Sequence, residues 1–235
     1  MAFLGSVLGV WAHPDDETYL SAGIMAYTAS TGGRIVCVTA TRGEEGSWDE
    51  ERWPTATMGQ VREVELMRCL EILGVTEHHW LDLRDGTCAD LAFEEGVGRV
   101  EAFMKDVAPD SVLTFGPDGM TDHADHKAVS AWTTEAFRRS AKNGARLYYA
   151  TQTPDWAERF VPVMQRFNVF EAGTPPVTPR EDLAVSFALE PELLERKLEA
   201  IAAHESQVEG MMNAFGRDFF RESMGEENFR LAAEA

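Results

Sequence analysis

Two clusters of histidine and aspartate are the residues of this sequence best suited to metal chemistry. The first is His13-Pro14-Asp15-Asp16-Glu17, in which a histidine and an aspartate lie three residues apart. Pro14 restricts His13 to extended backbone conformations, which aims its ring away from the preceding segment. Imidazole and carboxylate form a mixed ligand set that suits zinc, and iron or cobalt less well. Asp15 cannot easily point the same way as its neighbours, so it is free to contact a water on the metal.

The second cluster, Asp122 to His126, contains two histidines three residues apart and follows a loop of glycine, proline and aspartate at 116–119. Each cluster alone has a purely structural explanation, because acidic residues stabilise a helix N-terminus and histidines at a helix start are often simply exposed. Two ligands from the first cluster and one from the second would make three. Three protein ligands and a water are the set typical of a catalytic zinc.

A buried strand is expected immediately before the first cluster, and a second strand follows it along the chain. Ser6 to Ala12 is an apolar run of strand length, and Arg34 to Ala40 is a second run rich in β-branched residues. Apolar residues recur at helical spacing between them, and Gly32-Gly33 ends that helix. The pattern predicts a βαβ unit, whose two strands run parallel with a right-handed crossover.

The same alternation continues to residue 150. Helical stripes are expected near 66–74, 93–107 and 129–136, and strands at 79–83, 111–115 and 146–150. This rhythm predicts an α/β fold: one three-layer, Rossmann-like, doubly wound sheet that is mostly parallel. Ligands bind at the carboxyl ends of the strands in such sheets, and both clusters fall there.

The rhythm loosens after residue 150. We assign 1–150 to a Rossmann-like catalytic core, and 151–235 to a C-terminal extension of the same domain that completes the sheet and the pocket wall. An amphipathic helix near Trp156 to Phe167 is interpreted mainly as packing, with a pocket wall as the alternative. A turn-rich connector at Gly173 to Pro179, a last strand at Leu183 to Leu189 and a final helix from Pro191 to about His204 follow.

Composition limits the partners. The 235 residues include 40 acidic and 21 basic side chains, a net charge of −19, which disfavours nucleic acid and anionic membranes because both are bound largely through Lys and Arg. No run approaches the roughly 20 apolar residues that span a bilayer. Three dispersed cysteines suit a reducing cytoplasm. We expect a small-molecule partner, and homo-oligomerisation stays open.

Four segments together resemble the LmbE-like (PIG-L) family. They are the two clusters, the segment Thr41-Arg42-Gly43-Glu44-Glu45-Gly46, and Arg62 to Leu66, in the same order and at similar spacing over about the first 150 residues. The segment Glu195 to Gln207 is similar more weakly. The family contains zinc-dependent N-acetylglucosamine-type deacetylases and the mycothiol-pathway deacetylase and amidase.

The resemblance implies a role for each matching residue. Zinc ligands would be His13, Asp16 and His126, and Asp15 would be the general base. His123, oriented by Asp125, would face the oxyanion, and Arg62 and Asp85 would contact sugar hydroxyls. Ala124 departs from the family's usual proline, and Asp122 from the small residue that is common there.

The sequence therefore predicts a zinc-dependent hydrolase that removes an acyl group, foremost acetyl, from an N-acylated amino sugar or related conjugate. Three alternatives remain. One is an amidase acting on a bulkier thiol conjugate, and another is a non-catalytic carbohydrate-binding module that retains a metal site. The third, a phosphatase-like enzyme with Asp15 or Asp16 as nucleophile, is opposed by the net charge of −19 and the lack of a basic phosphate cradle.

Overall fold

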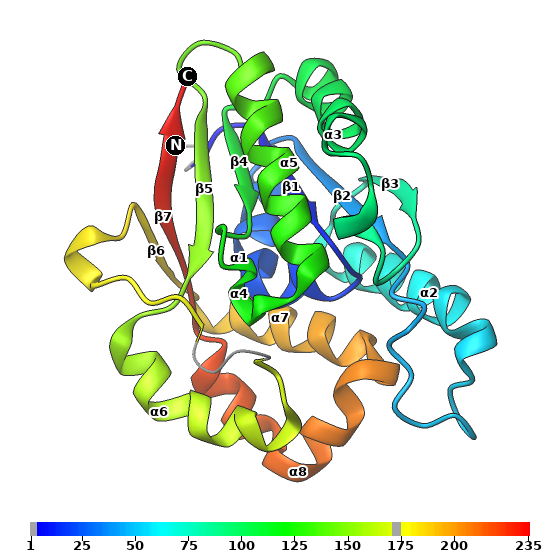
Figure 1. Cartoon of the computed structure of the whole chain (residues 1–235). Helices are drawn as coiled ribbons and strands as arrows, with labels where there is room; N and C mark the ends of the chain where they lie inside the picture. The colour runs from blue at the N-terminus through cyan, green and yellow to red at the C-terminus, as the bar shows by residue number, and fades with distance from the viewer. Residues whose placement is uncertain (1–3, 171–174) are drawn as a thin grey trace.

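One seven-stranded sheet organises the chain, in the order β3-β2-β1-β4-β5-β7-β6 (Figure 1). The structure, a computed structural model, describes residues 4–170 and 175–235. The strands are β1 (Val7–Trp11), β2 (Ile35–Thr41), β3 (Glu77–Leu83), β4 (Ser111–Thr114), β5 (Arg146–Thr151), β6 (Val185–Ala188) and β7 (Glu226–Glu234).

The first five strands are parallel, as the alternating pattern predicts. In register, Val7 of β1 lies opposite Ile35 of β2 on one side and Ser111 of β4 on the other. Every residue of β1, β2 and β4 is buried. Strands covered on both faces have no polar side, which is why these segments read as unbroken apolar runs.

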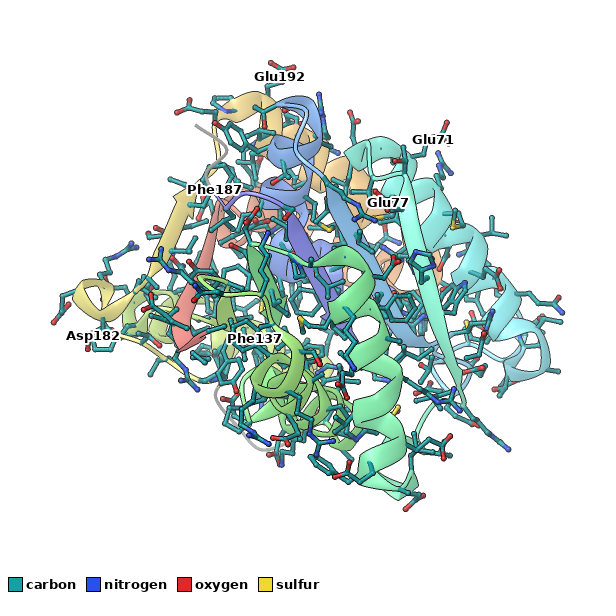
Figure 2. All side chains as sticks on the ribbon, turned by 90° about the horizontal axis from the view of Figure 1, so that it is seen from above. Glu71, Glu77, Phe137, Asp182, Phe187 and Glu192 are labelled. Atoms are coloured by element: carbon teal, nitrogen blue, oxygen red, sulfur yellow. The ribbon has the colours of Figure 1, made fainter. Side chains whose placement is uncertain are left out.

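Helices cover both faces of the sheet, which Figure 2 shows from above. Helices α3 and α5 pack together on one face, and α1, α2 and α7 pack together on the other. The predicted three-layer, doubly wound α/β fold is therefore confirmed. The helices of these layers are α1 (Asp16–Ser30), α2 (Thr55–Leu73), α3 (Phe93–Val107), α5 (Ala124–Ser140) and α7 (Pro191–Ala203).

The remaining helices lie beside the sheet or at its lower end in Figure 1. They are α4 (Gly119–Asp122), α6 (Pro154–Met164), α8 (Glu205–Ser223), and three short 3-10 turns, η1 (Cys88–Asp90), η2 (Gln165–Phe167) and η3 (Arg180–Asp182). Helices α6 and α8 share a second, smaller hydrophobic core with α7, whose members include Phe160, Leu198, Ile201 and Phe220. None of the described helices is long and apolar enough to cross a membrane.

The C-terminal region differs from the prediction in two ways. The strand expected at 183–189 exists as β6, but it is not the last, because β7 enters the sheet between β5 and β6, antiparallel to both. The helix begun at Pro191 is not final either, since α8 follows it after a break at His204. Of the predicted connector at 173–179, residues 173 and 174 lie outside the described residues.

The strand order marks one place for a binding site. From β1 the chain proceeds outward through β2 to β3, whereas β4 lies on the opposite side of β1 and leads on to β5. Connections therefore leave β1 and β4 in opposite directions, and their carboxyl ends border a crevice. The segments that follow these two strands contain the two predicted clusters.

Candidate active site

The two clusters meet at the carboxyl ends of β1 and β4. The Nδ1 atom of His13 lies 3.1 Å from Nε2 of His126. Oδ2 of Asp16 lies 3.7 Å from the same His13 nitrogen, and Oδ1 of Asp16 lies 3.4 Å from the His126 nitrogen. Two atoms bound to one tetrahedral zinc are about 3.3–3.5 Å apart, given bonds of about 2.0–2.2 Å. The three side chains therefore approach one another at about the spacing of ligands around a small cation.

Hydrogen bonds fix which ring nitrogen of each histidine faces this point. Nδ1 of His126 lies 2.9 Å from the carbonyl oxygen of Gly119, to which it donates as N–H, so Nε2 keeps its lone pair. Nε2 of His13 lies 3.0 Å from the Asp85 carboxylate and 3.4 Å from that of Asp125, which leaves Nδ1 as the ligand atom. Such outer partners orient metal-binding histidines.

The local charge also favours a cation. Burial alone would lower the pKa of His13, but the carboxylates of Asp125, Asp85 and Asp16 outweigh it and raise the pKa to about 10. Burial, together with the charges of His13 and His123, lowers the pKa of His126 well below its ordinary value, so this ring stays neutral. The carboxylates around His13 thus attract positive charge toward the point at which the neutral ring of His126 offers a lone pair.

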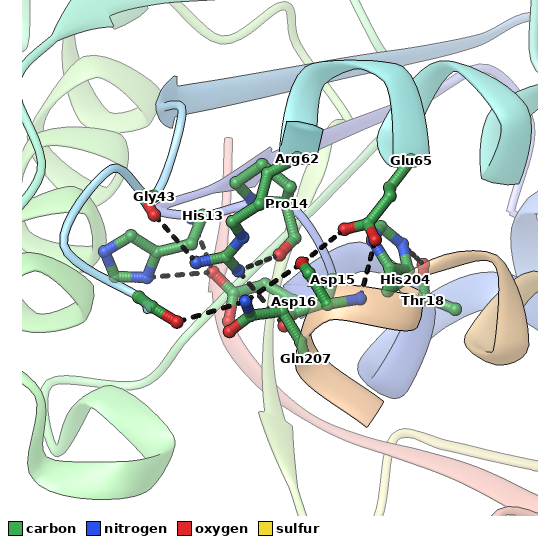
Figure 3. Close-up of polar contacts among 12 residues, drawn as sticks. His13, Pro14, Asp15, Asp16, Thr18, Gly43, Arg62, Glu65, His204 and Gln207 are labelled. Atoms are coloured by element: carbon green, nitrogen blue, oxygen red, sulfur yellow. Dashed lines mark hydrogen bonds and ion pairs between the residues drawn. The ribbon is translucent and has the colours of Figure 1, made fainter. Parts of the chain in front are cut away.

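Asp15 is held beside this point in a rare backbone conformation. Its φ is 103°, in the left-handed region that non-glycine residues seldom adopt. Its amide donates to the Glu17 carboxylate at 3.1 Å, and its own carboxylate accepts from Arg62 at 3.1 Å (Figure 3). Burial raises the pKa of Asp15 to about 6, although the Arg62 charge opposes the rise.

His123 also lies in the site, but its link to Asp125 differs from the prediction. The backbone amide of Asp125 donates to Nδ1 of His123 at 3.2 Å, whereas the Asp125 carboxylate is directed to His13 and accepts from the amides of Gly86 and Cys88. One ligand atom from each of His13, His123 and His126 lies within 4.8 Å of the others. The His123 ring is therefore near enough to act on a group bound there.

Arg62 and Asp85 line the same pocket, yet both are already engaged by protein groups. The Arg62 guanidinium donates to the carbonyls of Gly43 and Pro14 as well as to Asp15 (Figure 3). Asp85 contacts the His13 ring and accepts from the Glu45 amide at 3.0 Å. These contacts indicate that Arg62 holds Asp15 in position and that Asp85 holds the His13 ring. They support these roles more directly than the predicted contacts with sugar hydroxyls.

A second group of polar side chains lies behind the first. We call Glu17, Thr18, Cys69 and His204 the buried cluster, because each is at most 1% exposed. Nε2 of His204 lies 3.1 Å from the Thr18 hydroxyl and 3.4 Å from the Glu17 carboxylate. His204 is not among the residues that line the pocket, but it is linked to them through Glu17, which accepts from the Asp15 amide. The contacts of His204 with Thr18 and Glu17 were not predicted. The sequence pointed to His204 only through the weak family resemblance of the segment that ends at Gln207.

A cavity of about 500 Å³ opens above His13, Asp16 and His126. Its floor includes His13, Asp15, Asp16, His123 and His126, and its far wall comes from α6 and α8. The packing interpretation of the α6 segment was therefore incomplete: Phe160 packs inward, but Trp156 and Met164 face the cavity.

The sequence and the fold were compared with known proteins. A 1D-myo-inositol 2-acetamido-2-deoxy-alpha-D-glucopyranoside deacetylase from Saccharomonospora viridis is 28% identical over 229 residues, 86% of this chain and 85% of its own. The zinc-inhibited form of teicoplanin deacetylase Orf2 has a similar fold, with a TM-score of 0.71 and 15% identity over 98% of both chains.

A third similar structure is the 4-carboxy-2-hydroxymuconate hydratase GalB from Pseudomonas putida, with a TM-score of 0.66 and 18% identity over 98% of this chain and 97% of its own. One fold therefore carries hydrolytic and hydratase chemistry, and the fold alone does not select between them. The family model for PIG-L, GlcNAc-PI de-N-acetylase, matches residues 8–137, more than half of the 235 residues. As the four sequence segments predict, this chain belongs to the PIG-L family.

Proposed function

We propose that this chain is a divalent-metal-dependent deacetylase that hydrolyses the amide bond of an N-acylated amino sugar or related conjugate. The observation that carries the proposal is the convergence of His13, Asp16 and His126, whose side-chain nitrogen and oxygen atoms approach pairwise to 3.1–3.7 Å at the base of a cavity. These residues would hold a cation, which would lower the pKa of a nearby water and polarise an amide carbonyl.

Asp15 is the residue best suited to accept the proton of the attacking water. Its carboxylate lines the cavity next to Asp16, and Arg62 holds it in place. A base is most effective when its pKa lies near the working pH, and burial raises the pKa of Asp15 to about 6. The same proton can pass to the amine nitrogen as the carbon–nitrogen bond breaks, which yields a carboxylic acid and an amine.

His123 is the residue best suited to stabilise the oxygen of the tetrahedral intermediate. Its Nδ1 accepts the amide proton of Asp125, which fixes the orientation of the ring. An imidazole placed in this way can stabilise a developing oxyanion, and the interaction strengthens as negative charge grows. The side chain lines the same cavity as Asp15 and His126, which is the placement this role requires.

The named relatives support this assignment over the alternatives. The relative from Saccharomonospora viridis is a deacetylase of an acetamido sugar linked to inositol, and its similarity covers 86% of this chain. A carbohydrate-binding module would not need Asp15 in a rare backbone conformation beside a cation site. We propose zinc as the cation because of its nitrogen and carboxylate ligands, with iron and cobalt as alternatives.

The cellular setting is also a proposal. All three cysteines, Cys37, Cys69 and Cys88, are free and buried, which suits a reducing cytoplasm. The partner would be a small molecule that enters the cavity, and the net charge of −19 disfavours nucleic acid or anionic lipid.

The decisive experiment replaces Asp15 with Asn. Asn tolerates positive φ about as well as Asp does, so the backbone can keep its shape while the base is lost. We expect kcat for amine release from N-acetylglucosamine-type substrates to fall about a thousandfold, roughly 4 kcal/mol, with about one metal ion retained per chain.

Asp82→Asn is the matched control. Asp82 also has positive φ, but it is exposed and far along the chain, on β3. We expect this variant to keep wild-type turnover and metal content. An Asp15→Asn protein as active as wild type would remove Asp15 as the base, and wild-type protein that binds metal but releases no amine from any N-acyl sugar or thiol conjugate would favour a binding module.

A further inference from the structure

The cavity above the cation site has two chemically different sides. Near His13 the lining groups are polar and include Glu45, Arg62, Asp85 and Gln207. The opposite side comes from α6, the segment after it, and α8. We call this side the apolar wall, and its main members are Trp156, Met164, Phe170, Met211, Phe215 and Phe219.

The apolar wall is supported from behind. Phe160, beneath it, is 6% exposed, and its ring centroid lies 5.5 Å from that of Trp156 and 5.7 Å from that of Phe219. The Phe215 ring is tilted by 44° against that of Phe219, and the two ring centroids lie 4.8 Å apart. Aromatic rings at these spacings stabilise one another. The rings of the wall therefore hold one another in place beside a cavity of about 500 Å³.

A sugar alone does not explain this wall. Sugar hydroxyls that leave water need hydrogen-bond partners, and the ring faces and thioethers of the wall offer almost none. The polar side can serve such hydroxyls, because Gln207 and Glu45 lie there. A wall of aromatic and methionine side chains instead binds ligand surface that water solvates poorly.

We propose that the substrate is amphiphilic: an N-acylated amine whose amide lies at the cation site and whose apolar part, an alkyl chain or an aromatic ring, lies against the apolar wall. This inference rests on the proposed hydrolysis, in which water adds to the amide carbon, the carbon–nitrogen bond breaks, and an acid and an amine leave. The apolar part can belong to the acyl group or to the amine, and substrate series separate these two sources.

The first experiment measures kcat/KM for amine release in two series. One series lengthens the acyl group of an N-acylglucosamine from acetyl to butyryl, hexanoyl and octanoyl. The other keeps N-acetyl and lengthens a β-alkyl glycoside from methyl to hexyl and octyl. We expect kcat/KM to rise up to about fourfold for each methylene buried, in one series only. If kcat/KM is flat or falling in both series, the inference is wrong.

The second experiment changes the wall. Phe215→Ser should lower the ratio of kcat/KM for the best long-chain substrate to that for the acetyl or methyl parent by at least fivefold, because the chain loses an aromatic partner. Ala214→Ser, an exposed neighbour on α8, is the matched control and should keep the ratio. Met211→Trp gives a second change, since a larger side chain should shorten the preferred chain. Unchanged ratios in both wall variants would overturn the inference.

A third experiment separates this inference from the proposed function. Binding of octyl β-glucoside and methyl β-glucoside, which contain no amide, is measured by calorimetry on wild-type and Phe215→Ser protein. Tighter binding of the octyl compound, lost in the variant, supports the wall even if no amide is hydrolysed. Equal binding of both compounds contradicts the wall, even if the enzyme deacetylates small sugars.

Discussion

The protein holds two histidine–carboxylate groups that share one short segment, residues 13–18, and differ in what surrounds them. At the cation site, Nδ1 of His13 and Nε2 of His126 lie 3.1 Å apart at the floor of a cavity. In the buried cluster, His204 is 1% exposed, and its Nε2 is taken by Thr18 and Glu17. The residue types are alike, but only one group has atoms that face open space.

Cys69 shows the same difference between the cation site and the buried cluster. It belongs to the buried cluster, where burial and the charge of Glu17 raise the pKa of its thiol well above the ordinary value. A thiol that stays protonated is a poor nucleophile and a poor metal ligand. The comparison teaches that access to the cavity separates the group that does chemistry from the group that supports it. The substitutions below test that division, from the largest expected effect to the smallest.

Removal of a cation ligand should have the largest effect. In His13→Ala, two of the three ligands remain, and Asp85 and Asp125 lose the ring they orient. We expect metal content to fall from about one ion per chain to near zero, and kcat/KM to fall at least a thousandfold, roughly 4 kcal/mol. Elemental analysis and an amine-release assay measure both. Full metal content in this variant would mean that the cation binds elsewhere.

Loss of His204 should instead affect stability. Its removal leaves the Glu17 carboxylate, which is fully buried, without its main partner. Breaking a buried pair in this way costs about 3 kcal/mol, so we expect His204→Ala to lower the unfolding free energy by roughly that amount. Urea denaturation measures it, and the exposed His79→Ala serves as control. If His204→Ala lost its bound metal but kept its stability, His204 would belong to the cation site and not to the buried cluster.

Asp125 tests how far the cation site depends on its outer contacts. The carboxylate is fully buried and contacts the His13 ring and the amides of Gly86 and Cys88. We expect Asp125→Asn to weaken metal affinity or kcat/KM by about 10- to 100-fold. Asp122→Asn, an exposed carboxylate of the same loop, should leave both unchanged. Equal behaviour of the two variants would contradict the assigned contact.

The sequence was most informative where contacts are local. His13 and Asp16 lie three residues apart, and the apolar runs at β1 and β4 predicted that both clusters end up at one edge of the sheet. The contacts of Asp85 and Asp125 with His13 were not predicted, although these residues lie 72 and 112 residues away, no farther along the chain than His126. No local pattern distinguishes a carboxylate that orients a ring from one that faces water.

Strand β7 was missed for a similar reason. It begins with two glutamates, and Glu227 is 2% exposed although charged. Its carboxylate accepts from Lys197 at 2.8 Å and from the amides of Gly23 and Ile24 at 2.7 and 2.9 Å. These partners lie far away in sequence, so nothing near the segment indicates that Glu227, Asn228 and Phe229 are buried in the sheet. Helix α8 was missed because Gly210 and Gly216 interrupt its apolar periodicity.

The smallest effect is expected at Cys69. Its sulfur lies 3.6 Å from the Glu17 carboxylate and 2.9 Å from the Thr18 hydroxyl, and Glu17 keeps its contacts with His204 and Thr18 when the sulfur is removed. We expect Cys69→Ala to lower the unfolding free energy by about 1 kcal/mol, through a weak hydrogen bond and a small cavity. Metal content should be unchanged, and kcat/KM should stay within about twofold of wild type, because no atom of Cys69 reaches the pocket. A Cys69→Ala protein that folds normally but has lost turnover would contradict the division between the two groups, since the buried cluster would then take part in the reaction.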